Sequence, residues 1–205
     1  SQKFSFLVLL GMVVGLIILE PDLGTAVIVV GIAVGLYFLS GASVSHFLAL
    51  IPILLISIGV LAVFSPYRFS RVLTFVNPER DPLGASYQIK QVLLALGSGG
   101  ITGVGIGKSR QKYEYLPEAN TDSIFAIIGE EVGYVGALAV IGIYIFILWR
   151  GFRIARYAPD PFGRLTALGI SLWFGIQTCI NLSAMTALIP LTGIPLPLIS
   201  YGGSS

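Results

Sequence analysis

Five long apolar runs constrain this chain more than any other feature of its sequence. A helix that crosses a bilayer core of roughly 30 Å needs about 20 apolar residues. The runs are continuously apolar and lack the alternation of membrane β-barrel strands, so they predict helices. We therefore expect an all-α fold: a polytopic bundle of transmembrane helices in one membrane domain. The expected spans are residues 4–19, 23–42, 47–67, 123–149 and 165–188.

Charged residues are scarce, which restricts the class of protein further. Only 11% of the 205 residues are charged, against roughly 25% in a soluble domain. Twelve basic and ten acidic residues give a net charge of +2, too balanced for a protein that binds nucleic acid. The single cysteine, Cys179, lies in an apolar run, so neither a disulfide framework nor a thiolate metal site is expected. The sequence predicts an integral membrane protein.

The distribution of basic residues predicts the orientation of the spans. Four arginines crowd the connector 150–164, which should therefore be cytoplasmic. Counting spans back from it places three segments together on the outer side: the turn 20–22, the loop 68–122 and the tail 189–205. The loop itself holds seven basic and five acidic residues, which argues for the opposite side. The rule that basic loops stay in the cytoplasm holds for short loops, and at 55 residues this loop is near its length limit. The shorter connector therefore decides the predicted orientation.

The loop 68–122 carries 12 of the 22 charged residues, so chemistry is expected there. Its glycine-rich stretch, 97–109, ends in Gly-Lys-Ser but has Thr102 where a phosphate loop needs glycine. We interpret these glycines as sites of tight turns and close backbone approach, although nearby backbone amides could still meet a phosphate. The short amphipathic segment 87–96 before them is expected at the membrane interface.

Carboxylates are the available general bases, because His46 is the only histidine and has no metal-ligating companion. Asp122 is expected in the first turn of the span that follows the loop, capped by Asn120 or Thr121. There it either complements the helix dipole or serves a chemical role. Glu130 and Glu131 should lie about two turns inside that span, where carboxylates usually face an aqueous cavity or a partner.

Four motif-bearing stretches run from one end of the chain to the other: 20–25 (Glu-Pro-Asp-Leu-Gly-Thr); 71–88, with Asn-Pro at 77–78 and Asp-Pro-Leu-Gly at 81–84; 111–131, with Pro-Glu-Ala-Asn-Thr-Asp at 117–122; and 192–205, with Thr-Gly-Ile-Pro-Leu-Pro at 192–197. Their order and spacing resemble the SEDS family of cell-wall glycosyltransferases, which includes FtsW, RodA and SpoVE, and FtsW most closely. Family members have ten spans, of which this chain would match about half. The family usually has His and Phe where Asn120 and Ser123 stand.

The resemblance implies that the protein polymerises lipid II, the undecaprenyl-diphosphate-linked disaccharide pentapeptide, at the outer face of the cytoplasmic membrane. It marks Asp122 as catalytic: one inverting displacement needs a base for the acceptor 4-hydroxyl and cations for the departing diphosphate. No resident cofactor or metal ligand is expected, although a divalent cation, Mg or Mn, could assist the diphosphate. The expected substrate-binding residues are Lys112, Arg71, Glu118, Lys108, Arg110, Arg68, Glu20, Asp22 and Ser200.

The resemblance also implies partners: lipid II and the growing glycan strand, a class B penicillin-binding protein transpeptidase, and division or elongation proteins. Two readings from other classes stay open at this point. Carboxylates in the membrane are also typical of a lipid transporter or flippase, with Glu20, Asp22, Glu130 and Glu131 as a polar route. The chain could instead belong to a non-enzymatic division scaffold.

Overall fold

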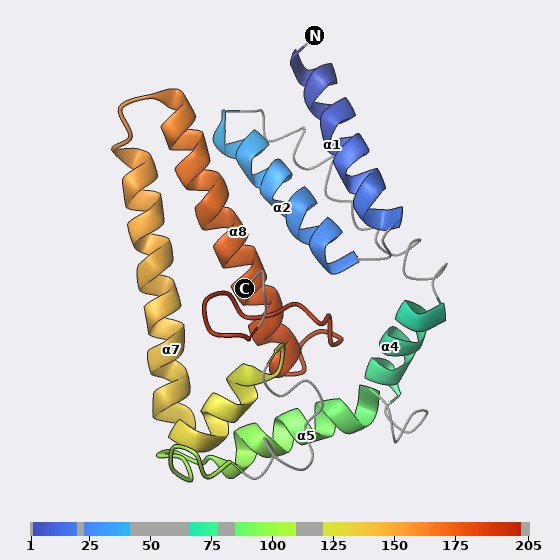
Figure 1. The fold of residues 1–205 in the computed structure, drawn as a ribbon, viewed down its shortest axis with the longest axis vertical. Coiled ribbons are helices and arrows are strands. Elements are labelled where there is room, and N and C mark those ends of the chain that lie inside the picture. The colour runs from blue at the N-terminus through green and yellow to red at the C-terminus, as the bar shows by residue number, and fades with distance from the viewer. Residues whose placement is uncertain (1, 20–22, 42–65, 78–84, 110–120, 202–205) are drawn as a thin grey trace. The chain divides into compact units, whose positions relative to one another are not determined.

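Every regular element in the described part of the chain is an α-helix. The computed structural model describes the chain except for residues 1, 20–22, 42–65, 78–84, 110–120 and 202–205. Within the described residues there is no strand, so the predicted all-α class is confirmed. The helices are α1 (Gln2–Leu19), α2 (Leu23–Leu39), α4 (Pro66–Val76), α5 (Ala85–Ser98), α7 (Ile124–Arg156) and α8 (Pro161–Met185) (Figure 1).

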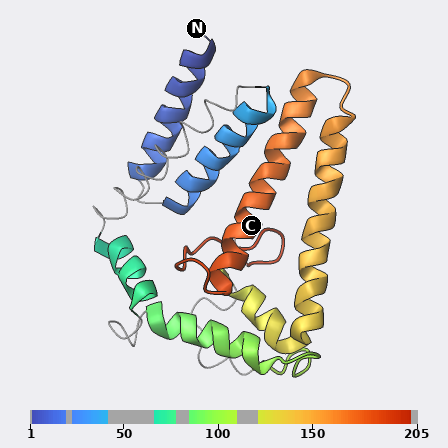
Figure 2. The same cartoon turned by 180° about the vertical axis from the view of Figure 1, so that it is seen from behind.

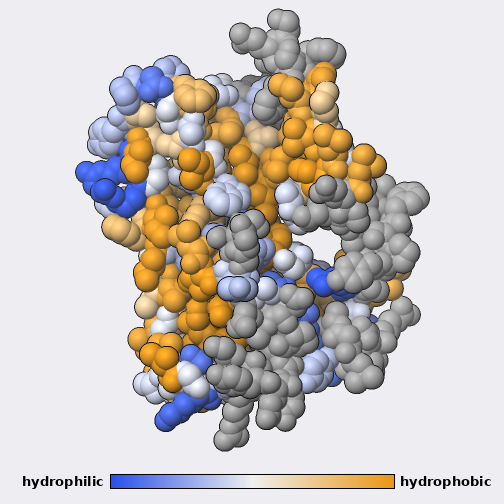
Figure 3. All heavy atoms as spheres, viewed as in Figure 1, coloured by the Kyte–Doolittle hydropathy of each residue, from blue (hydrophilic) through white to orange (hydrophobic). Residues whose placement is uncertain are grey.

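Two of these helices, α7 and α8, are long and apolar enough to cross a bilayer, judged over the described residues. The apolar stretches of α1 and α2, Val8–Ile17 and Gly24–Leu39, are shorter. Large apolar side chains are exposed along α1 and α7, and Figure 3 shows apolar atoms gathered over α7. Apolar surface this extensive is unfavourable in water and favourable against lipid chains. The third expected span, 47–67, lies almost wholly outside the described residues.

The chain divides into two compact units, the first made of Ser1–Leu61 and Leu148–Ile176, and the second of Ala62–Ile147 and Gln177–Ser205. In the first unit, glycines bring α2 close to the first part of α8. A β-carbon added at Gly31 would lie 3.0 Å from Cδ1 of Ile176, and one at Gly35 would lie 2.8 Å from Cδ1 of Leu172. Small residues four apart let membrane helices approach in this way.

Both membrane-crossing helices have ends that differ from those expected from the apolar runs. α7 continues to Arg156 instead of ending at 149, because arginine is a good helix former whose long side chain reaches the polar interface. α8 begins at Pro161, where Asp160 caps it by accepting a hydrogen bond of 2.6 Å from the amide of Gly163. It ends at Met185, and Ala187 follows in the left-handed conformation, with φ 54°.

The expected loop 68–122 contains most of α4, which begins at Pro66, and all of α5, which includes the whole of the amphipathic segment 87–96. α5 lies beside the first part of α7 in both views (Figure 1, Figure 2). The approach is close, because a β-carbon added at Gly129 would lie 2.5 Å from Cδ2 of Leu96. The second unit therefore packs a helix of the loop directly onto the helix that follows it.

α7 is broken near its start, at Gly133, whose backbone has φ 73° and ψ −169°. Figure 1 shows the short first part of the helix at an angle to the long second part. The glycine-rich stretch after α5 fills the break with its own backbone. Four hydrogen bonds join them: Val104 N to Glu130 O, Gly105 N to Glu131 O, Tyr134 N to Gly100 O and Val135 N to Ile101 O.

The glycines of this stretch make the contact possible. A β-carbon added at Gly99 would lie 2.0 Å from the carbonyl oxygen of Gly129, and one at Gly103 would lie 2.2 Å from that of Glu131. No side chain larger than a hydrogen atom fits at such distances. The interpretation of these glycines as sites of close backbone approach is thus confirmed. The helix over the expected span 123–149 is not continuous, because it breaks at Gly133.

Candidate active site

Asp122 lies in a turn, residues 121–123, that leads directly into α7. Its side chain is only 7% exposed, and the hydroxyl of Thr121 donates a hydrogen bond of 3.1 Å to its Oδ1. The expectation that Asp122 falls in the first helical turn is wrong, since α7 begins at Ile124 and has no acidic residue in that turn. Ser123 takes the position just before the helix, yet its hydroxyl is buried without a hydrogen-bond partner. A turn, not the helix itself, presents the carboxylate.

A segment near the end of the chain, residues 191–200, lies beside this carboxylate. A β-carbon added at Gly193 would lie 3.9 Å from Oδ2 of Asp122, and Gly193 itself has φ 71°, a conformation that favours glycine. Asn181 of α8 joins the two segments. Its Nδ2 donates to the backbone oxygen of Asp122 at 2.9 Å and to that of Ile194 at 2.8 Å. The structure thus brings the aspartate and the 191–200 segment together.

Two further side chains hold the 191–200 segment in place. Nε2 of Gln177 donates a hydrogen bond of 2.9 Å to the backbone oxygen of Pro195. The hydroxyl of Tyr144 donates one of 2.5 Å to the backbone oxygen of Pro197. Prolines lack an amide hydrogen, so this non-helical stretch depends on side chains for much of its hydrogen bonding.

Two predicted substrate-binding residues, Arg71 and Ser200, also bond to this segment. Nη1 of Arg71 donates to the backbone oxygen of Leu191 at 2.7 Å, across 120 residues of sequence. The buried hydroxyl of Ser200 accepts a hydrogen bond of 2.7 Å from the amide of Leu196 and closes a local turn. Both side chains therefore take part in holding the segment, a role that the sequence did not suggest.

Glu130 and Ser109 form a buried pair at the break in α7. Each side chain is 3% exposed, and the serine hydroxyl donates a hydrogen bond of 2.5 Å to Oε2 of Glu130. Oε1 of the neighbouring Glu131 is buried without a hydrogen-bond partner. As expected, the two glutamates lie about two turns into α7, and they stand just before its break at Gly133. They lie where the helix stops, and Ser109 is the partner that the buried Glu130 required.

Lys108, next to Ser109, is exposed at the end of the glycine-rich stretch. Its amide donates to the backbone oxygen of Gly105 at 3.1 Å, which holds the backbone here in a turn. The remaining expected substrate-binding residues fall outside what the structure describes. These are Arg110, Lys112, Glu118, Glu20 and Asp22, together with the side chain of Arg68, whose backbone belongs to α4.

Among the described residues, no group of three or more His, Cys, Asp or Glu side chains could hold a metal ion.

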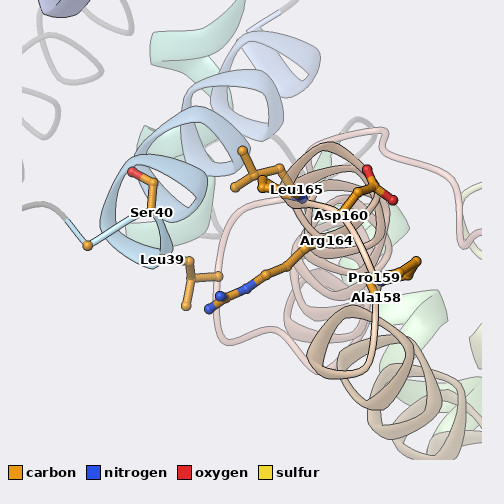
Figure 4. Close-up of a pocket in the computed structure, with 9 residues that line it drawn as sticks. Leu39, Ser40, Ala158, Pro159, Asp160, Arg164 and Leu165 are labelled. Carbon is orange, nitrogen blue, oxygen red and sulfur yellow. The ribbon is translucent and has the colours of Figure 1, made fainter.

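Two of the cavities that the described residues form lie elsewhere, and neither is lined by a predicted site residue. One, of about 480 Å³, belongs to the first unit, where Arg164 extends toward Leu39 beside the α7–α8 connector (Figure 4). The other, of about 400 Å³, belongs to the second unit and runs along α7 across its break. Its lining is almost entirely apolar: Leu96, Gly100, Phe125, Gly129, Gly133, Tyr134, Ala137, Leu138, Ile141, Leu182, Ser183, Thr186 and Leu188.

Sequence reasoning missed Asn181, Gln177 and Gly193. The two amides were visible as polar residues inside the apolar run 165–188, where each unsatisfied amide group would be costly. Gly193 stood within a recognised motif but was given no role. A search for polar side chains inside the spans would have found the first two.

This fold and site define a class: a polytopic helical membrane protein that buries a carboxylate in the turn before a membrane-crossing helix. The chain belongs to the family of FtsW, RodA and SpoVE, whose family model, described as "Cell cycle protein", matches residues 1–205. The predicted family is thereby confirmed, and the chain is a membrane protein.

The similarity to named relatives is high over nearly all of this chain. It is 46% identical over 208 residues to stage V sporulation protein E of Bacillus subtilis (strain 168), covering 100% of this chain and 57% of that protein. It is 47% identical over 193 residues to the "Probable peptidoglycan glycosyltransferase FtsW" of Buchnera aphidicola subsp. Baizongia pistaciae, covering 93% and 51%. The chain thus spans about half the length of these relatives.

Solved structures agree with the fold. A chain described under "Structural coordination of polymerization and crosslinking by a peptidoglycan synthase complex" matches with a TM-score of 0.74 and 32% identity, covering 97% of this chain and 55% of that one. The rod shape determining protein RodA of Thermus thermophilus matches with a TM-score of 0.61 and 30% identity, covering 97% and 49%.

Proposed function

We propose that this protein, at the full length of its relatives, polymerises lipid II into β-1,4 glycan strands. The observation that carries the proposal is the placement of Asp122 in a chain of this family. Its carboxylate is buried, stands in a turn, and lies beside Gly193 of a second motif-bearing segment. A carboxylate held in this way is positioned to act on a substrate that reaches it from the membrane surface.

The reaction is a single inverting displacement. Asp122 takes the proton from the 4-hydroxyl of the acceptor sugar, and that oxygen forms a bond to the anomeric carbon of the donor. The bond from this carbon to the diphosphate breaks, and undecaprenyl diphosphate leaves with the electron pair. Positive side chains stabilise the negative charge that develops on the diphosphate.

We assign that role to Lys108, which is exposed, and to Arg110, Lys112, Arg68 and Arg71. Arg71 also holds the 191–200 segment through Leu191, so it links diphosphate binding to the position of that segment. Glu118, Glu20, Asp22 and Ser200 are proposed to border the path of the substrate.

The orientation is part of the proposal. In the cytoplasmic (inner) membrane, residues 68–122 would face outward and the arginine-rich connector 150–164 would face the cytoplasm. The connector is compact, since only residues 157–160 separate α7 from α8. Asp122 would then meet lipid II on the side where glycan strands are assembled.

We further propose a class B penicillin-binding protein transpeptidase as partner, together with division or elongation proteins. Support comes from the similarity to a chain from a peptidoglycan synthase complex that coordinates polymerisation and crosslinking. A glycan strand made at Asp122 would pass to such a partner for crosslinking.

One observation favours the flippase alternative: α7 is broken and carries a buried glutamate at the break. Broken helices often line transport sites near the middle of the membrane. Here, however, the break is filled by the backbone of the glycine-rich stretch, and Ser109 bonds to Glu130. These hydrogen bonds favour a fixed contact between the loop and α7 over a segment that moves during transport.

Purified full-length protein in liposomes, supplied with fluorescent lipid II, separates these functions. Glycan-strand electrophoresis detects polymer, and a membrane-impermeant quencher detects movement of lipid II between leaflets. Polymer without added transferase is the expected result. Translocation with no polymer would support the flippase, and neither activity would support the scaffold.

A further inference from the structure

Asn181 holds the backbone of the proposed catalytic residue. Its side chain lies on α8 and is 1% exposed. Nδ2 donates one hydrogen bond to the backbone oxygen of Asp122, 59 residues away in sequence, and one to that of Ile194, 13 residues away. Both partners are carbonyl oxygens, which only accept hydrogen bonds, so the amino group must face them and the orientation of the amide is fixed.

These two bonds set the geometry around the carboxylate. The first restrains Asp122 through its own backbone oxygen, two covalent bonds from the Cα that carries its side chain. The second restrains the segment that includes Gly193, the neighbour of Oδ2. Ser123, which could have capped α7 and fixed the turn, leaves its hydroxyl without a hydrogen bond. The amide of Asn181 therefore connects the carboxylate to the segment opposite it.

We propose that Asn181 is a positioning residue. It fixes the Asp122 carboxylate relative to the 191–200 segment and acts on the reaction through Asp122. This inference rests on the proposed function of Asp122 as general base. A base displaced by about 1 Å from its productive position can cost roughly 10²-fold in rate. Asn181 contacts neither reacting sugar in this role, so it should affect turnover more than substrate affinity.

The chain offers a matched control in Gln177. It lies one helical turn earlier on α8, is 5% exposed, and donates from Nε2 to the backbone oxygen of Pro195 at 2.9 Å. Like Asn181, it is a buried amide that holds the same segment. Unlike Asn181, it donates no hydrogen bond to Asp122 within the described part of the chain. Its loss reports the structural cost of removing a buried amide from α8.

The test compares Asn181→Leu and Gln177→Leu in the full-length protein, with kcat and KM measured on lipid II per folded, monodisperse molecule. We expect Asn181→Leu to lower kcat about 10–100-fold with KM nearly unchanged. Gln177→Leu should lose similar thermal stability but lower kcat several-fold less than Asn181→Leu, because Gln177 holds the segment and makes no bond to Asp122. Equal kcat values for the two variants would overturn the positioning role. Should Asn181→Leu not fold, the smaller Asn181→Ala, set against Gln177→Ala, decides by the same comparison.

A double variant separates this inference from the proposal beneath it. If Asn181 acts through Asp122, adding Asn181→Leu to Asp122→Asn lowers the residual turnover no further. Losses that multiply would contradict the inference while leaving Asp122 as the base. Normal turnover of Asp122→Asn alone would instead remove the proposed function, whatever Asn181 does.

Discussion

At the scale of single residues, the sequence pointed to Asp122 but not to what surrounds it. The resemblance of residues 117–122 to a family motif singled out the aspartate. Its neighbours Asn181 and Gly193 are 59 and more residues away in the chain, so only the folded structure shows that they meet it. Local pattern even misplaced Asp122 within a helix that begins two residues later.

Glu130 gives the residue-scale prediction. Glu130→Ala removes the acceptor of the 2.5 Å bond from Ser109 and should destabilise the protein by about 1–3 kcal/mol, the usual cost of leaving a buried hydroxyl without a hydrogen bond. Glu131→Ala is the control, because Oε1 of Glu131 is buried and makes no hydrogen bond. The measurement is thermal unfolding of the purified full-length protein in detergent. Equal losses for the two variants would show that the Ser109 bond is not what stabilises the break.

At the scale of helices, apolar runs predicted where spans lie but not where their helices end or break. The run 123–149 reads as continuous because glycine carries no side chain that would interrupt the pattern. A clue was present nonetheless, since two glutamates stand between Gly129 and Gly133 inside the apolar run. Glycines on both sides of acidic residues inside a span indicate a break in the helix. Here the glycine-rich stretch after α5 supplies the backbone groups that hydrogen-bond to the helix at its break.

Gly133 gives the prediction at this scale. Gly133→Ala forces a side chain into φ 73°, ψ −169°, a region that only glycine adopts readily, at a cost of about 1–3 kcal/mol. The new β-carbon would also lie 2.3 Å from the amide nitrogen of Gly103, so the true loss should be larger. Gly142→Ala in the same helix is the control: nothing lies within 4 Å of its added β-carbon, and alanine favours the helix by about 1 kcal/mol. A Gly133→Ala variant as stable as Gly142→Ala would contradict the observed break.

At the scale of the whole molecule, the composition established a membrane protein and the motifs established the family. The side of the membrane on which each functional segment lies could be inferred only by counting spans from the arginine-rich connector. An apolar run by itself does not indicate which of its ends faces the cytoplasm. The two arginines in the last turn of α7, Arg153 and Arg156, are the strongest basis for the proposed orientation.

Cysteine labelling tests that orientation. In a Cys179→Ser background, which removes the exposed native thiol, Arg80→Cys should react with an impermeant maleimide in intact cells. Tyr157→Cys, on the connector and 72% exposed, should react only after lysis. The reverse pattern would place the glycine-rich loop in the cytoplasm and exclude glycan synthesis at Asp122 on the outer face.

Asp122→Asn in the full-length protein tests the central claim most directly. Asparagine keeps the size of the side chain, an oxygen for the bond from Thr121, and the backbone oxygen that Asn181 holds. It replaces the proton-accepting oxygen by an amide NH2 group and leaves the backbone unchanged, so folded yield and melting temperature should stay close to those of the parent. Lipid II polymerisation, followed by glycan-strand electrophoresis, should fall roughly 10²–10⁴-fold, or about 3–5 kcal/mol in activation free energy. Normal strand synthesis by this variant would contradict the assignment of Asp122 as the general base.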